Sequence, residues 1–328
     1  MPALLKEEEM GRRLRVLLIG SKDSAQEYYK PLWDVADLVE VPSQREAVEA
    51  RIGEADACMT GLSLRFDDSL MAKAPRLRVL AFAATGRDHI DLDAAQKRGI
   101  HILCLKEETA FLRNVTATAE LAWGLLLAVN RKIPWAFDSA RQGKWRGFDG
   151  QRRGHQLSGK TLGVLGYGRL GTIVADYGLA FRMKVLACDT RAVKAAPGVT
   201  LVDHETLYRQ ADVLSIHIHL QGNEGFIDRN TFAKLKKGIV IVNTSRGGII
   251  DEQAFVEALE SGQVGAAGLD VIEGEWSENL YDHPLIRYAR EHETLVITPH
   301  IGGVTFESQE MTREFIIRKL ADYLKAMA

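Results

Sequence analysis

The sequence lacks a strong charge of either sign and is poor in cysteine. Its 328 residues carry 42 basic and 44 acidic side chains, a formal net charge of −2. Nothing in this balance favours nucleic acid or an anionic membrane surface as a partner. The three cysteines are odd in number, lack metal-ligand spacing and lie in or next to apolar runs, which predicts reduced core residues rather than a disulfide framework or a metal site: Cys58, Cys104 and Cys188.

Long apolar runs are also missing. No run is long enough to span a bilayer, and the start MPALLKEEEMGRR lacks the apolar stretch of a secretory signal. We therefore expect a cytoplasmic protein with no membrane partner. His217 and His219 fall on one face of a predicted strand, but no third ligand is evident, so no metal site is predicted.

What the sequence does contain is an alternation of short apolar runs and longer helical patterns. Near-continuous apolar strands separated by helices indicate parallel sheets covered on both faces, and hence an α/β fold. Residues 116–133 are apolar almost all round and predict a helix buried in a core or an interface. The Gly- and Arg-rich stretch 142–159 predicts a loop. The predicted strands form two groups, first 15–19, 55–60, 78–82 and 101–104, then 161–166, 184–188, 212–219, 239–243, 265–271 and 294–298.

A glycine pattern, TLGVLGYGRLG, joins a predicted strand to a predicted helix. Gly166, Gly168 and Gly171 fit G-x-G-x-x-G, and a second strand ends in Asp189, eighteen residues past the third glycine. The first glycine permits a turn, the second lets backbone N–H groups reach a pyrophosphate, and the third lets helix and strand pack closely. The helix N-terminus adds free donors and a favourable dipole. The context predicts a dinucleotide site, and a carboxylate at Asp189 favours NAD over NADP.

Polar side chains follow the later strands of the second group. Arg246 comes three residues after the end of IVIVN, within NTSRGGIIDE. Asp270 lies in the next predicted strand, Glu275 just beyond it, and His300 after TLVITP. Because ligands of open parallel sheets sit beyond the carboxyl ends of the strands, we expect these groups to converge near the nicotinamide.

The residue types suit the reduction of a 2-oxo acid. An arginine fork matches a carboxylate, and a histidine can give and retake a proton near neutral pH. A carboxylate beside the imidazole holds its tautomer. Asp270 can accept a hydrogen bond from the carboxamide of the cofactor. Each residue also has a structural reading: Glu275 as a solvated carboxylate, His300 as a satisfied core histidine, and Asp270 as a helix or turn cap.

Six ordered blocks make the chain resemble the D-2-hydroxyacid dehydrogenase family. They are ATGRDHIDLDAAQKRGIHI (84–102), TAELAWGLLLAVNRKI (118–133), LSGKTLGVLGYGRLG (157–171), NTSRGGIIDE (243–252), GAAGLDVIEGE (265–275) and ITPHIGG (297–303). The resemblance implies that Arg246 binds the substrate carboxylate and that His300, paired with Glu275, is the acid/base. Expected cofactor contacts come from the same blocks and from Asp189 after the second strand: Gly166, Gly168, Arg169, Leu170, Gly171, Asp189, Thr244, Ser245, Asp270, Gly302 and Gly303.

The resemblance also implies a domain plan. A Rossmann cofactor domain, 113–303, would be inserted into a flavodoxin-like substrate domain made of 1–112 and 304–328. In the substrate domain, the backbone N–H groups of Ala84, Thr85 and Gly86 would bind the carboxylate of the substrate. Family members are typically homodimers joined through the cofactor domain, which fits the apolar 116–133 helix.

Departures from the family pattern keep alternatives open. Trp276 replaces the usual Pro after the catalytic Glu, and the stretch from there to His300 is longer than usual. Gly61 stands where phosphoglycerate-type members often have a basic residue, so a phosphorylated substrate is not expected. One alternative is an NAD(H)-sensing protein of the corepressor type. Another is a phosphite-type dehydrogenase, whereas Glu275 in place of Gln argues against the formate type.

Overall fold

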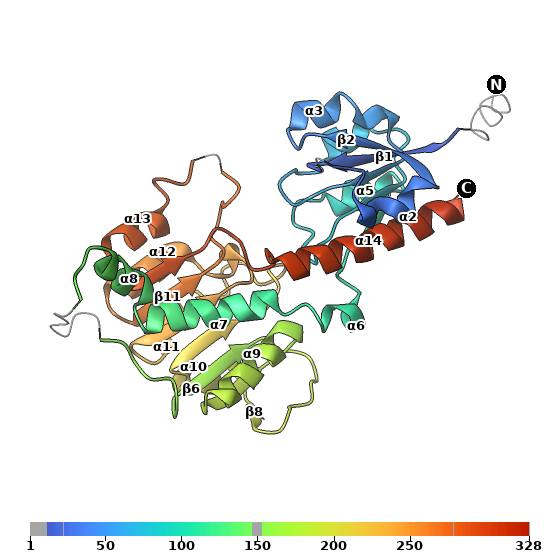
Figure 1. Ribbon diagram of the computed structural model, residues 1–328. Helices are drawn as coiled ribbons and strands as arrows, with labels where there is room; N and C mark the ends of the chain where they lie inside the picture. The colour runs from blue at the N-terminus through green and yellow to red at the C-terminus, as the bar shows by residue number, and fades with distance from the viewer. Residues whose placement is uncertain (1–11, 22, 146–152, 278, 328) are drawn as a thin grey trace. The chain divides into compact units, whose positions relative to one another are not determined.

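The computed structural model describes residues 12–21, 23–145, 153–277 and 279–327, and the chain divides into two compact units (Figure 1). Unit 1 comprises Met1–Leu112 and Thr305–Ala328, and unit 2 comprises Arg113–Val304. The chain therefore leaves unit 1 once and returns to it once. The roles of the two units as substrate and cofactor domains stay predictions at this point.

Unit 1 is built on a five-stranded parallel sheet with strand order β2-β1-β3-β4-β5, the doubly wound order of flavodoxin-like sheets. Its strands are β1 (Leu14–Ile19), β2 (Ala36–Val41), β3 (Ala57–Met59), β4 (Val79–Ala81) and β5 (His101–Leu103). Its helices are α2 (Lys30–Trp33), α3 (Arg45–Glu49), α4 (Asp68–Ala72), α5 (Leu92–Lys97), α6 (Thr109–Leu112) and α14 (Phe306–Met327). Short 3-10 turns occupy Glu27–Tyr29 and Ile52–Glu54.

The C-terminal helix α14 packs on unit 1 itself. It contacts α2 and β5, and it buries Ile316, Leu320 and Leu324. Phe315 stacks on Phe111 with the ring centroids 4.1 Å apart. No helix among the described residues is long and apolar enough to cross a membrane.

Unit 2 holds a seven-stranded parallel sheet with strand order β12-β11-β10-β9-β6-β7-β8. Read from β8, this is the Rossmann order with one added strand, and the order reverses between β6 and β9. The strands are β6 (Thr161–Leu165), β7 (Lys184–Cys188), β8 (Val199–Leu201), β9 (Val213–Ile216), β10 (Ile239–Asn243), β11 (Val264–Leu269) and β12 (Leu295–Ile297). The helices are α7 (Ala117–Asn130), α8 (Ile133–Arg141), α9 (Arg169–Ala180), α10 (His204–Gln210), α11 (Arg229–Lys234), α12 (Glu252–Glu260) and α13 (Pro284–Glu291), and Gly247–Ile249 forms a 3-10 turn.

Alternate residues of β10 point to two separate cores, because successive side chains of a strand face opposite sides of its sheet. Ile239 and Ile241 join the core under α10 to α13, whereas Val240 and Val242 join the core under α7 and α9. All five residues of β10 are buried. Both faces of this sheet are therefore covered, and the predicted α/β fold with two parallel sheets is confirmed.

Several predicted boundaries were wrong. The helix expected over 116–133 ends at Asn130, because Lys132 adopts a left-handed φ of 53° and Pro134 opens a new helix, α8. The strand expected over 212–219 ends at Ile216, so His217 and His219 do not share a strand face. Asp270 lies just after β11 rather than within it. The predicted loop 142–159 falls partly outside the described residues.

Candidate active site

The glycine turn between β6 and α9 is shaped by two steric requirements. Gly166 has a φ of +93°, and a Cβ there would lie 2.5 Å from the carbonyl oxygen of His217. A Cβ at Gly171 would lie 2.0 Å from the carbonyl oxygen of Gly166. Gly168 caps α9 and has open space where its Cβ would stand, except for a guanidinium nitrogen of Arg191 at 3.3 Å. That open space, at the N-terminus of a twelve-residue helix, suits a pyrophosphate.

Two further residues of the fingerprint face the protein. The Arg169 guanidinium donates to the carbonyl oxygen of Val115 at 2.6 Å, and burial lowers its pKa. Leu170 packs partly buried against the core under α7 and α9. Their expected contacts with the cofactor stay predictions.

Asp189 follows β7 and forms a two-pronged ion pair with Arg191. Its Oδ1 accepts from Nε at 2.9 Å and its Oδ2 from Nη2 at 2.8 Å, and the backbone N–H of Arg191 adds a bond of 2.9 Å. These bonds hold the pKa of the Asp189 carboxyl below its usual range. The side chain of Asp189 is 6 % exposed and that of Arg191 66 % exposed. The carboxylate is therefore fixed and ionised, while most of the arginine side chain is exposed to solvent.

The loop after β10, which carries Arg246, is organised by a buried asparagine. Asn243 is fully buried, donates from Nδ2 to the carbonyl oxygen of Arg246 at 2.9 Å, and accepts from the N–H of Ser245 at 2.9 Å. The Ser245 hydroxyl donates to the carbonyl oxygen of Ile216 at 2.8 Å. Thr244 is buried as well. The position of Arg246 is thus set by bonds to β9 and β10, and sequence reasoning missed Asn243, whose signal is a polar residue closing the apolar run IVIVN.

Asp270 is 1 % exposed and ties down the turn that carries His300. Its Oδ1 accepts from the Thr298 hydroxyl at 2.5 Å and from the N–H of Ile301 at 2.9 Å, and its Oδ2 accepts from the N–H of Gly302 at 2.7 Å. The backbone N–H of Asp270 donates to the carbonyl oxygen of Asn243 at 2.9 Å. The turn-cap reading of Asp270 therefore describes contacts that are present, and its proposed bond to a carboxamide stays a prediction.

His300 and Glu275 are in direct contact. The distance from Nδ1 of His300 to Oε1 of Glu275 is 2.7 Å, and the two side chains are 27 % and 15 % exposed. Because Nδ1 faces the carboxylate, Nε2 is left without a protein partner among the described residues. His300 has a left-handed φ of 53°, uncommon for a non-glycine residue and often found at functional sites. Oε2 of Glu275 is buried and has no hydrogen-bond partner in the described part of the chain.

One sheet edge therefore collects most of the predicted groups. Backbone hydrogen bonds link the end of β10, the end of β11 and the turn after β12. The N–H of Asp270 donates to the carbonyl oxygen of Asn243, and the N–H of His300 donates to the carbonyl oxygen of Asp270 at 3.0 Å. Gly302 lies beside Asp270, whereas Gly303 has open space around it. Ala84, Thr85 and Gly86 follow β4 in unit 1. Their part in holding a carboxylate stays a prediction.

Trp276, directly after Glu275, is an exposed aromatic at this edge. Its side chain is 62 % exposed, and its ring centroid lies 6.0 Å from that of His300. The arrangement of a paired imidazole with a free Nε2, an arginine on a fixed loop and an uncovered indole suits acid/base chemistry on a small anion.

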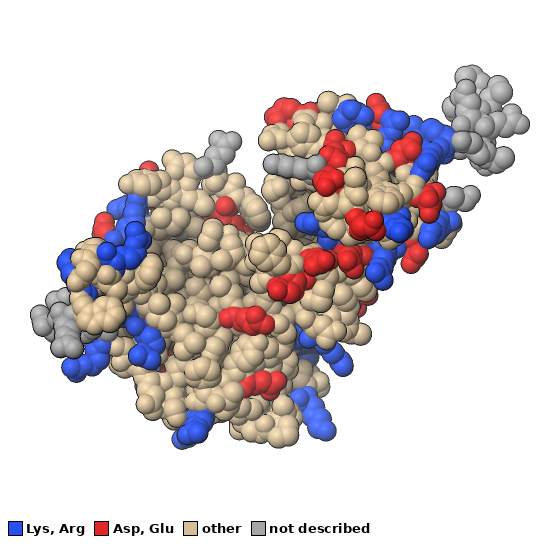
Figure 2. All heavy atoms as spheres, in the orientation of Figure 1, with Lys and Arg blue, Asp and Glu red and all other residues tan. Residues whose placement is uncertain are grey.

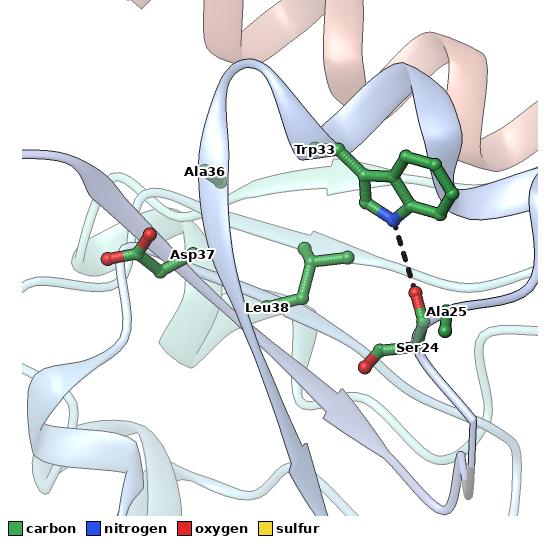
Figure 3. Close-up of a pocket in the computed structure, with 6 residues that line it drawn as sticks. All are labelled: Ser24, Ala25, Trp33, Ala36, Asp37 and Leu38. Atoms are coloured by element: carbon green, nitrogen blue, oxygen red, sulfur yellow. Dashed lines mark hydrogen bonds between the residues drawn. The ribbon is translucent and has the colours of Figure 1, made fainter.

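A separate hollow on unit 1 carries none of the predicted site residues. It has a volume of about 400 Å³ and is lined by Ser24, Ala25, Trp33, Ala36, Asp37 and Leu38 (Figure 3). The indole N–H of Trp33 donates to the Ser24 carbonyl oxygen at 3.1 Å, so the polar groups there are partly used by the fold. We assign no function to it.

Similarity to known proteins bears on the family. The family model described as "D-isomer specific 2-hydroxyacid dehydrogenase, NAD binding domain" matches residues 123–302. A hydroxypyruvate reductase of Thermotoga maritima is 36% identical over 270 residues, which cover 82% of this chain and 85% of that protein. A D-3-phosphoglycerate dehydrogenase of Mycobacterium tuberculosis is 37% identical over 270 residues, 81% of this chain but 48% of that protein. The chain thus spans about half the length of the phosphoglycerate dehydrogenases it matches.

Solved structures agree with the fold. A D-lactate dehydrogenase of Aquifex aeolicus, in complex with NAD and lactic acid, has a TM-score of 0.82 and 26% identity, covering 95% of this chain and 96% of that one. The expected family and the expected cofactor, NAD, are confirmed. The chain belongs to the D-isomer specific 2-hydroxyacid dehydrogenase family, and residues 123–302 match its NAD-binding domain.

Proposed function

We propose that the protein is an NAD-dependent oxidoreductase that interconverts a D-2-hydroxy acid and its 2-oxo acid. The observation that carries the proposal is the 2.7 Å contact between Nδ1 of His300 and Oε1 of Glu275, on the sheet edge that also holds the Arg246 loop. A dehydrogenase needs a group that can donate and retake a proton beside a fixed cation, and this edge offers both.

In the proposed reduction, bound NADH supplies the hydride to the carbonyl carbon of the substrate. His300 donates the proton on Nε2 to the carbonyl oxygen, and the Glu275 carboxylate stabilises the positive imidazolium beforehand. Arg246 holds the substrate carboxylate by a two-pronged contact and polarises the neighbouring carbonyl. In the opposite direction, the neutral imidazole takes the hydroxyl proton. Backbone N–H groups of Ala84, Thr85 and Gly86 are proposed to complete the carboxylate site.

The proposed cofactor contacts begin at the open Gly168 position and end at Asp189. The carboxylate of Asp189 can accept from the ribose hydroxyls, and its negative charge opposes a 2′-phosphate, which favours NAD over NADP. Oδ2 of Asp189 accepts one bond from Arg191 and has a second lone pair that can accept from a ribose hydroxyl. Thr244, Ser245, Asp270, Gly302 and Gly303 are proposed to contact the nicotinamide end.

We also propose a cytoplasmic homodimer joined through unit 2. Ile133 and Phe137 of α8 are 51 % and 61 % exposed, and Phe181 after α9 is 41 % exposed. Figure 2 shows an area around α7 that is mostly free of charged side chains. Exposed apolar side chains favour a protein partner, and the family resemblance favours a second copy.

The test is turnover with NADH and a panel of small 2-oxo acids. We expect His300→Ala to lower kcat/KM by ~10²–10⁴-fold, the usual contribution of a general acid/base, while NADH still binds. His292→Ala is the matched control, because His292 is exposed at the end of α13 in the same unit. Full turnover by His300→Ala would remove His300 from this role.

Arg246→Lys separates substrate binding from cofactor binding. A point charge cannot reproduce the fork, so we expect a rise in KM for the 2-oxo acid with little change in the Kd of NADH. Arg229→Lys, on an exposed pair with Glu257, is the control. A protein that binds NADH but reduces no acid in the panel would favour the sensing alternative, and phosphite-dependent reduction of NAD⁺ would favour the phosphite type.

A further inference from the structure

Unit 2 contains a second carboxylate–imidazole pair, next to the one that carries the proposed chemistry. Oε2 of Glu252 lies 3.1 Å from Nε2 of His283, and the side chains are 13 % and 12 % exposed. Glu252 opens α12, six residues after Arg246. His283 stands directly before α13, eight residues after Glu275. The pair therefore joins the segment that follows Arg246 to the segment that follows Glu275, two residues of the proposed site.

The hydrogen bonds fix how this pair is protonated. Nδ1 of His283 accepts from the backbone N–H of Leu285 at 3.3 Å and so caps α13. A ring nitrogen that accepts a bond carries no proton, so the neutral ring holds its proton on Nε2, facing Glu252 and the carbonyl oxygen of Glu273 at 3.1 Å. The ring proton is thus directed at the carbonyl oxygen of Glu273, and the Glu252 carboxylate lies beside the same nitrogen.

Glu252 makes its second contact at the base of the Glu275 turn. Its Oε1 accepts from the backbone N–H of Glu273 at 2.7 Å, two residues before Glu275. Burial raises the pKa of Glu252, and the charge of Glu273 acts in the same direction, while His283 opposes it. His283 and Glu273 are the titratable groups beside Glu252 among the described residues.

The two segments also touch through their backbones. A Cβ at Gly247, the residue after Arg246, would lie 2.1 Å from the carbonyl carbon of Ile272 and 2.3 Å from the nitrogen of Glu273. Glu252 thus holds, through its bond to Glu273, the segment that packs against Gly247. A shift of the Glu273 backbone would change its packing against Gly247 and would also move Glu275.

We propose that Glu252 and His283 are positioning residues that hold the 272–275 turn against the Arg246 loop, so that Glu275 meets His300. The inference rests on the proposed function for its kinetic consequences. Its physical basis is that a displacement of about 1 Å in an active site can cost about 100-fold in rate. Neither residue is proposed to touch the substrate or the cofactor.

The kinetic test compares variants of Glu252. Glu252→Ala should lower kcat by about 10-fold or more, with a smaller change in KM for the 2-oxo acid and no change in the Kd of NADH. Glu252→Gln should recover most of the activity, because its amide oxygen still accepts from Glu273. Glu257→Ala is the matched control: it removes a carboxylate from the same helix, paired with Arg229, and should leave kcat unchanged.

Two readouts separate positioning from a general loss of stability. The pH profile of kcat/KM for Glu252→Ala should move in the same direction as that of Glu275→Gln. In the double variant, the loss should be no larger than in Glu275→Gln alone, because both changes break one contact. An unchanged pH profile, or losses that multiply, would overturn the proposal. Should Glu252→Ala fail to fold, His283→Gln gives the same comparison.

Failure of the proposed function is distinguishable from failure of this inference. If the wild-type protein reduces no 2-oxo acid, the reaction assigned above is wrong, and the positioning role is decided by NMR of the histidine rings. The His300 ring signals, identified by their loss in His300→Gln, should shift in Glu252→Ala towards their position in Glu275→Gln. Ring signals that coincide with those of the wild type would refute it.

Discussion

Two glycines of the same turn are expected to differ in how alanine changes stability, although both substitutions should weaken NADH binding. Gly171 lies inside α9, and a Cβ there would stand 2.0 Å from the carbonyl oxygen of Gly166, which is 1.4 Å closer than an ordinary contact of 3.4 Å. Overpacking of this kind costs about 1–3 kcal/mol, whereas alanine in a helix otherwise gains about 0.5–1 kcal/mol. We expect Gly171→Ala to destabilise unit 2 by about 1–2 kcal/mol and to weaken NADH binding.

Gly168→Ala should leave stability intact and still remove binding. The backbone of Gly168, with φ −91° and ψ −156°, is open to alanine, and the only near neighbour is the end of the exposed Arg191 side chain. The free energy of unfolding should change by less than about 0.5 kcal/mol. The added methyl group stands where the pyrophosphate is expected, so the Kd of NADH should rise at least about 10-fold, or about 1.4 kcal/mol.

Urea unfolding and NADH fluorescence titration measure the two effects on the same samples. Gly61→Ala is the control, since this exposed glycine of unit 1 has nothing within 4 Å of its Cβ position and should change stability by less than about 0.5 kcal/mol. Wild-type affinity in Gly168→Ala would refute the assignment of the pyrophosphate to this turn. Wild-type stability in Gly171→Ala would refute the steric reasoning.

Two further predictions concern stability. Burial lowers the pKa of His217 to about 4 from 6.5; because the unfolded chain takes up the proton first as pH falls, unit 2 should lose up to about 3 kcal/mol between about pH 6.5 and 4. His217→Gln should flatten this slope in urea unfolding, and parallel slopes would contradict the assignment. Asp67 caps α4 through the Leu70 N–H at 2.9 Å and pairs with Arg45 at 2.8 and 2.9 Å, so Asp67→Ala should destabilise unit 1 by about 1–2 kcal/mol. Arg45→Ala removes the same ion pair and should also destabilise unit 1. A loss of less than about 0.5 kcal/mol in the free energy of unfolding of both variants would contradict this prediction.

The sequence predicted the buried strands and the edge strands β5 and β12, and it missed the edge strands β2 and β8. Strands such as β6 and β10 consist mainly of apolar residues and are buried on both faces, so their sequence alone predicts them. β2 and β8, each at one edge of its sheet, were missed because they expose polar or charged residues, as in ADLVEV. Such strands are defined by their hydrogen bonds to a neighbouring strand, and a local sequence pattern does not predict which strands pair.

Residues at the site were predictable where strand order alone brings them together. His300 and Glu275 lie 25 residues apart, yet both follow neighbouring parallel strands, and the structure places them 2.7 Å apart. The Glu252–His283 pair was not predictable. Each residue begins a helix, where polar side chains are common, and their contact depends on how two loops 31 residues apart fold onto each other.

The bonds of Asp270 have a consequence for reading mutational surveys of this protein. A single carboxylate secures the hydroxyl of Thr298 and the amides of Ile301 and Gly302, so any replacement unsettles the stretch that presents the imidazole. A deep mutational scan scored on growth would therefore flag this codon as intolerant even if its side chain never met a dinucleotide. Intolerance at that codon is evidence about architecture first, and only a binding measurement on a folded variant can turn it into evidence about the cofactor.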